Sequence, residues 1–82
     1  MRAKNINEDN ITEFFDVIDK CEGKVEIITE DMRLNIKSKI AQYVSIAKIF
    51  FNEDIKGEIE ILAYNQQDVL RIMNFMNNAE TN

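Results

Sequence analysis

Residues 25–38, with the sequence VEIITEDMRLNIKS, decide most of the expected fold. Val25, Ile27 and Thr29 occupy every second position, and a second alternating run follows after two acidic residues. Alternation on both sides of a short polar turn is typical of a β-hairpin with one buried face. At Ser38 the apolar spacing changes to three and four, and serine is a preferred helix N-cap residue. The stretch therefore predicts two antiparallel strands followed directly by a helix.

Amphipathic helices are predicted on both sides of this hairpin. One begins at Asn10, the expected N-cap, and is expected to end at Gly23 in a left-handed turn. The helix that starts at Ser38 and a C-terminal helix capped by Asn65 each carry one apolar face as well. The apolar positions are Ile11, Phe14, Phe15, Ile18 and Cys21 in the first helix, Ile40, Tyr43, Val44, Ala47 and Phe50 in the second, and Val69, Ile72, Met73 and Met76 in the third.

Two further strands complete the predicted element order. Ile59, Ile61 and Ala63 alternate with acidic residues, and a short strand is expected over residues 3–6. The order is then β-α-β-β-α-β-α in one domain that covers residues 1–82. One apolar face on each helix and strand favours an α+β fold with a four-stranded antiparallel sheet. We expect an open-faced β-sandwich, with three helices covering one face of the sheet.

The composition excludes several classes of function. The chain has no histidine and one cysteine, which rules out histidine-based catalysis, phosphohistidine transfer and multi-cysteine zinc sites. Its net charge of −5 disfavours nucleic acid and anionic membranes, because both attract a surplus of lysine and arginine. No apolar stretch approaches the length of a membrane span. We therefore expect a cytoplasmic protein without metal or other cofactor, and without enzyme activity, since no nucleophile with a base is recognisable.

Basic residues gather in the middle of this acidic chain. Arg33, Lys37, Lys39 and Lys48 fall in a segment from 33 to 50 that contains no acid. Such a basic island favours docking of an acidic partner or a phosphorylated ligand. A solvated surface without a partner explains the same pattern.

The arrangement around Lys37-Ser38 resembles HPr, the small phosphocarrier protein of the bacterial sugar phosphotransferase system. Lys37-Ser38 directly follows the hairpin, and the strand GEIEI at 57–61 leads into a capped C-terminal helix, as in that family. In HPr a histidine before the first helix carries the phosphoryl group, within a loop that also holds an arginine. Asn7 and Asp9 occupy these two places here. Because an amide accepts no phosphoryl group and an acid repels the donor, the resemblance implies a regulatory or protein-binding relative that carries no phosphohistidine.

Ser38 matches the regulatory serine of that family. A phosphoserine at a helix N-cap would meet free backbone N–H groups, with Lys37 and Lys39 beside it. Cations at the start of a helix are mildly destabilising unless an anion is near, which favours an anion site. The alternative is that Ser38 only caps the helix and has no further function. The resemblance further implies that the exposed side of the second helix binds a protein partner through Ile40. Arg33 and Lys48 of the basic island, and Phe51 of the consecutive Phe50-Phe51 at the end of that helix, are further candidate contacts.

A ferredoxin-like or ACT-type sheet remains the alternative fold, because it shares the element order without the last helix. It would imply a small ligand-sensing or dimerisation module, so the partner is either another protein or a second copy of this chain. The two folds differ in strand order, which the sequence alone does not reveal.

Overall fold

A computed structural model of the protein describes residues 1–50 and 59–81. Its elements are α1 (Ile11–Lys20), β1 (Val25–Ile28), β2 (Arg33–Asn35), α2 (Lys39–Ser45), the π-helical turn η1 (Ile46–Phe50), β3 (Glu60–Ala63) and α3 (Gln66–Thr81). The predicted hairpin, the last strand and the three helices are therefore confirmed. Phe51 and the segment up to Glu58 lie outside the described residues.

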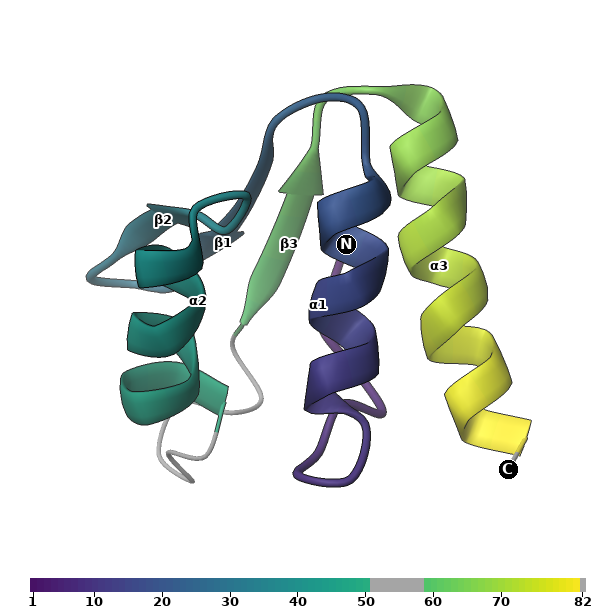
Figure 1. The fold of residues 1–82 in the computed structure, drawn as a ribbon, viewed down its shortest axis with the longest axis horizontal. Helices are drawn as coiled ribbons and strands as arrows, with labels where there is room; N and C mark the ends of the chain where they lie inside the picture. Colours follow the sequence, from purple (N-terminus) through teal and green to yellow (C-terminus); the bar gives the residue numbers. More distant parts are fainter. Residues whose placement is uncertain (51–58, 82) are drawn as a thin grey trace.

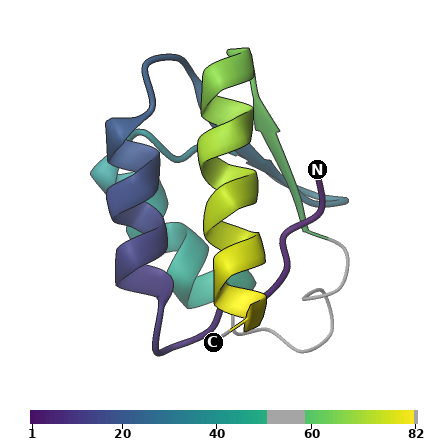
Figure 2. The ribbon, with the colours of Figure 1, turned by 90° about the vertical axis from the view of Figure 1, so that its right-hand side faces the viewer.

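The described strands form one antiparallel sheet in the order β2-β1-β3. Ile27 lies opposite Leu34 on one side and opposite Ile61 on the other, which places these apolar residues on one face. All three helices cover that face and leave the other open (Figures 1 and 2). The expected α+β class and open antiparallel sheet are confirmed, with three strands in the described residues instead of four.

The strand expected over residues 3–6 does not form. Asn5 adopts a φ of 60°, in the left-handed region, which interrupts an extended backbone there. Residues before Asn5 still pair with β3: Met1 exchanges backbone hydrogen bonds with Ile61, Arg2 forms a bridge with Glu60, and the Ala3 N–H donates to the Ile59 carbonyl at 2.9 Å. The N-terminal residues thus lie beside β3 without building a fourth strand.

The strand order differs from that of the ferredoxin-like alternative. In a split β-α-β unit the second hairpin strand is inserted between the N-terminal strand and the first hairpin strand. Here β2 pairs with β1 alone, and β1 is the central strand of the described sheet.

The core lies between the sheet and the helices. Phe14 and Ile18 of α1 are fully buried, and the Phe14 ring lies 5.8 Å from that of Phe75 on α3. The other buried apolar residues are Ile6, Ile11, Phe15, Cys21, Val25, Ile27, Ile36, Ile49, Ile59, Ile61, Ile72 and Met76. Met73, expected in the core, is 42% exposed, so the prediction for that residue is wrong.

The apolar face predicted for the second helix is not its buried face. Ile40 and Tyr43 are exposed, whereas Gln42, Ser45 and Ile49 are buried. Burying a polar side chain costs little when its hydrogen bonds are satisfied. Gln42 Nε2 donates to the Ile36 carbonyl at 2.9 Å, and Ser45 Oγ donates to the Ala41 carbonyl at 2.7 Å. These bonds allow α2 to turn its polar residues inward.

Gly23 does not form the expected left-handed turn. None of the described glycines has a positive φ. Gly23 packs against the start of α3: a Cβ there would lie 3.4 Å from Asn65 Cβ and from Asp68 Oδ2, at the lower limit of ordinary van der Waals contact. The fully buried Asp68 carboxylate accepts from the N–H groups of Gly23 at 2.8 Å and Glu22 at 3.0 Å. This carboxylate ties the end of α1 to the first turn of α3.

Candidate functional site

Ser38 is the N-cap of α2, as the sequence predicts. Its Oγ accepts a hydrogen bond from the Ala41 N–H at 3.4 Å, and its side chain is exposed. Its hydroxyl is therefore accessible to solvent while it caps the helix. Modification of Ser38 or anion binding there stays a prediction.

The Lys37 side chain forms hydrogen bonds with the C-terminal end of α1. Its Nζ donates to the carbonyls of Ile18 at 3.4 Å and Asp19 at 3.3 Å, and also to that of Cys21. The last carbonyls of a helix lack partners within the helix and carry partial negative charge, so a lysine here stabilises α1. The ammonium group that was expected to hold an anion at Ser38 thus caps α1.

Lys39 is likewise paired with α1. Its Nζ bonds to the Asp19 carboxylate, and Gln42 Nε2 donates to the other oxygen of Asp19 at 2.9 Å. The hydrogen bond from Lys39 is the main cause that holds the pKa of Asp19 below its ordinary value. Asp19 therefore supplies the negative charge for the lysine at the start of α2, and no external anion is needed there. The sequence did not reveal this pair, because no local pattern links residues 19 and 39.

The basic island of the sequence does not form one surface. Arg33 Nε lies 3.8 Å from Glu26 Oε2 on the open face of the sheet, whereas Lys37 and Lys39 contact α1 on the covered face. Lys48 is exposed in η1, with no ion pair within the described residues. Of the candidate contacts, Arg33 is thus separated from the start of α2.

Two large apolar side chains stand out at the exposed start of α2. Ile40 is 77% exposed and Tyr43 is 75% exposed, one helical turn apart on the same side of the helix. A groove of about 420 Å³ lies beside them, between α1 and α2. Its lining consists of Thr12, Phe15, Asp16, Lys39, Gln42, Tyr43 and Ile46. The exposure of Ile40 fits its predicted role as a partner contact, but sequence periodicity had not separated Tyr43 from the core.

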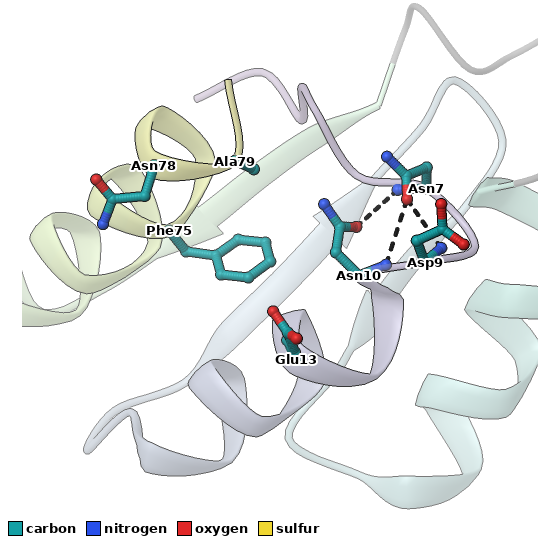
Figure 3. A pocket seen from close by; sticks show the side chains of 7 residues that line it. All are labelled: Asn7, Asp9, Asn10, Glu13, Phe75, Asn78 and Ala79. Carbon is teal, nitrogen blue, oxygen red and sulfur yellow. Dashed lines mark hydrogen bonds between the residues drawn. The ribbon is translucent and has the colours of Figure 1, made fainter. Parts of the chain in front are cut away.

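The positions that match the phosphocarrier loop, Asn7 and Asp9, lie just before α1. There they line a second hollow of about 360 Å³, opposite the Phe75 ring (Figure 3). Asn7 Oδ1 accepts from the N–H groups of Asp9 at 2.8 Å and Asn10 at 3.3 Å, while the Asn7 N–H donates to Asn10 Oδ1 at 2.8 Å. The Asn7 amide therefore shapes the turn. The carboxylates of Asp9 and Glu13 give this hollow a negative lining.

The open face of the sheet holds a polar cluster centred on Glu26. The buried Glu26 carboxylate accepts from the Tyr64 hydroxyl, and Lys24 Nζ lies 3.7 Å from it. These contacts lower the pKa of Glu26, first through the Tyr64 hydrogen bond, and the same bond raises the pKa of Tyr64. The Glu26 carboxylate is thus partnered within the protein.

Cys21 is buried at the end of α1, and its Sγ donates to the Val17 carbonyl at 3.4 Å. Burial raises the pKa of the thiol to about 11. The thiolate, which is the reactive form, is thus scarce at neutral pH.

Within the described residues, no group of three or more histidine, cysteine or acidic side chains is placed to hold a metal ion. Among the described helices, none combines the length and apolar character that a membrane crossing requires. The chain matches no known family model, no curated protein and no solved structure.

Proposed function

We propose that this chain is a non-catalytic protein-binding domain of HPr-like arrangement, and that it docks its partner through the exposed face of α2. One observation carries the proposal: Ile40 and Tyr43, one turn apart on α2, are 77% and 75% exposed, and Tyr43 lines a groove. Exposed apolar side chains that adjoin a concave surface are typical of protein interaction sites. The conclusion about the protein's role rests on this surface.

The arrangement of the elements supports the HPr-like part of the proposal. Three helices lie on one face of an antiparallel sheet, the N-terminal residues lie beside β3, and Ser38 caps α2. Asn7 lies in the loop before α1, as the resemblance implies for the position of the phosphocarrier histidine. The negative lining of the neighbouring hollow disfavours a phosphoryl donor and supports a role in binding.

Ser38 caps α2 two positions before Ile40. Its exposed hydroxyl at the N-cap supports its role as a modification site, and a phosphate there would compete with Asp19 for Lys39. Phosphorylation would thus change the charge at the start of α2 without refolding the helix. NMR titration with inorganic phosphate and incubation with a serine kinase of the sugar-phosphotransferase type test this role, and an unmodified protein with unshifted Ser38 and Ala41 amides would end it.

The docking proposal is tested with partner proteins that co-purify with the tagged chain from its native host. Ile40→Ser and Tyr43→Ser should each weaken the affinity of the purified partner about tenfold, because interface anchors of this size contribute on the order of 1–2 kcal/mol. Leu70→Ser is the matched control, since Leu70 is an exposed apolar residue on α3, 54% exposed. All three variants should fold normally. Equal affinities for Tyr43→Ser and Leu70→Ser would contradict the proposal.

A further inference from the structure

The charge of the docking surface differs from the charge that the sequence suggests. Lys39 is the one cation among the residues that line the groove, and Asp19 pairs with it. Lys37 points into the end of α1, where it bonds to backbone carbonyls. Lys39 is thus paired with an acid of α1, whereas Lys37 keeps its charge but does not line the groove. The groove lining itself therefore holds no unpaired cation.

Asp16 is the charge that remains in the groove. It lies on the exposed side of α1, lines the groove, and forms no ion pair or hydrogen bond with a side chain among residues 1–50 and 59–81. Lys39 and Asp19 cancel each other, so the lining together with its ion pair has a charge of about −1. An anionic partner would meet repulsion here, and a cationic one attraction.

The floor of the groove is apolar. Phe15 is buried and Ile46 is half-buried, and Tyr43 forms one wall. A volume of about 420 Å³ lies toward the lower end of the roughly 300–1,000 Å³ usual for binding pockets. The groove therefore accepts one or two apolar side chains, with Asp16 at its edge for a neighbouring cation.

We infer that the docking surface binds a basic amphipathic helix of a partner protein, one that places an apolar side chain in the groove and a lysine or arginine against Asp16. The inference rests on the proposed docking function and specifies the chemistry of its partner. Helices that lay an apolar stripe into a groove are a recurring mode of recognition, and their flanking charges select the partner. The acidic partner expected from the basic island is thereby replaced by a basic one.

A pair of synthetic peptides tests the sign of the charge. One carries a leucine stripe flanked by lysine, and its counterpart has glutamate at every lysine position; both are roughly 18 residues long, enough to form a helix on binding. Titration of the isotope-labelled full chain should shift the backbone amides of Asp16, Gln42 and Tyr43 saturably with the lysine peptide. The glutamate peptide should leave them unshifted.

Charge-reversal variants separate this groove from the general acidity of the chain. Asp16→Lys should weaken binding of the lysine peptide about fivefold or more, whereas Glu13→Lys, on the side of α1 that faces α3, should change it less than about twofold. Both variants alter the net charge equally. Equal losses, or lysine-peptide shifts that map elsewhere, would overturn the inference.

Failure of this inference is distinguishable from failure of the docking function. If the glutamate peptide binds the groove and Tyr43→Ser abolishes that binding, the docking surface stands and the basic partner is wrong. If neither peptide shifts the groove, the basic helix is also excluded, and the docking function is then decided by the affinities of the purified partner for the Ile40 and Tyr43 variants.

Discussion

Individual residues take roles that depend on partners far away in the chain. Asp68 appears in the sequence as an acid in the first turn of a helix, yet it is fully buried against Gly23 and Glu22. Lys37 appears as part of a basic cluster, yet it caps α1. In both cases the partner lies 16 or more residues away in the chain. The local sequence pattern therefore predicts where the helix begins but not the contact that the residue makes.

Among the described carboxylates, replacement of Asp68 should destabilise the fold most. Burial alone would raise its pKa, but hydrogen bonds from the N–H groups of Gly23 and Glu22 and from Arg71, at 2.7 Å, hold the pKa below its ordinary value. Asp68→Asn should lower the free energy of unfolding by about 2–4 kcal/mol, because buried donors and Arg71 lose their anion. Urea unfolding measures this loss, with Asp16→Asn as the exposed control, expected within about 0.5 kcal/mol.

The stability that Asp68 contributes should also depend on pH. Because its folded pKa lies below its unfolded pKa, the contribution is fully present above the unfolded value of about 3.9 and is lost as pH falls through the folded pKa. The difference in stability between the wild type and Asp68→Asn should therefore shrink in acid. A difference that stays constant from pH 7 to pH 2 would contradict this assignment.

Tyr64 reports on the cluster at the open face of the sheet. The Glu26 carboxylate, through its hydrogen bond, is the main cause that raises the pKa of Tyr64. Glu26→Gln should therefore lower the pKa of Tyr64 toward the ordinary tyrosine value. Ultraviolet titration of tyrosinate measures it, with Tyr43→Phe as the background so that only one tyrosine titrates. An unchanged titration midpoint would show that the two side chains do not interact.

Whole helices and strands follow the sequence more closely than single contacts do. Spacing alone located α1, the hairpin, the start of α2, β3 and α3, because periodicity reports which side of an element is apolar. It failed over residues 3–6, where Asn5 turns the backbone, and on α2, where Gln42 and Ser45 face inward. Gln42 is buried through a bond to Asp19, a partner that spacing cannot reveal.

The cap of α2 separates the structural role of Ser38 from its proposed regulatory role. Ser38→Ala should destabilise the protein by about 1 kcal/mol, whereas Ser38→Asp should cost less than about 0.5 kcal/mol, because aspartate is an equally good N-cap. Thermal unfolding compares the two variants. If Ser38→Asp destabilises as strongly as Ser38→Ala, the N-cap does not tolerate a negative charge, and a phosphate on Ser38 would disrupt α2.

The end of α1 depends on the side chain of Lys37. Lys37→Met keeps most of the aliphatic chain but removes the donor to three carbonyls, so the free energy of unfolding should fall by about 1 kcal/mol. Lys48→Met is the control, because Lys48 is exposed and forms no ion pair within the described residues; it should change stability by less than about 0.5 kcal/mol. Equal effects in urea unfolding would show that the loss of charge alone matters.

At the scale of the whole molecule, one layer of helices supports the proposed docking surface and the other face of the sheet stays open. Figure 1 shows α2 in the layer of helices. Ile40 and Tyr43 are exposed residues of α2, and Tyr43 lines the groove between α1 and α2. The opposite face holds the Glu26 cluster, whose charges are paired. The class of fold could be predicted from the sequence, whereas the role of Ile40 as a contact stays a prediction from the resemblance. The groove and its charge could not be predicted from the sequence, because both arise where α1 packs against α2.

Site-specific photo-crosslinking in the native host tests the docking surface most directly. A photoreactive phenylalanine analogue replaces Tyr43 in one variant and Leu70 on α3 in the other, both at exposed positions. We predict that position 43 crosslinks to a defined partner protein, through a basic segment identified by mass spectrometry, and that position 70 does not. Crosslinks of equal yield and identity at both positions, or none at position 43 while position 70 captures a partner, would contradict the assignment of α2 as the docking surface.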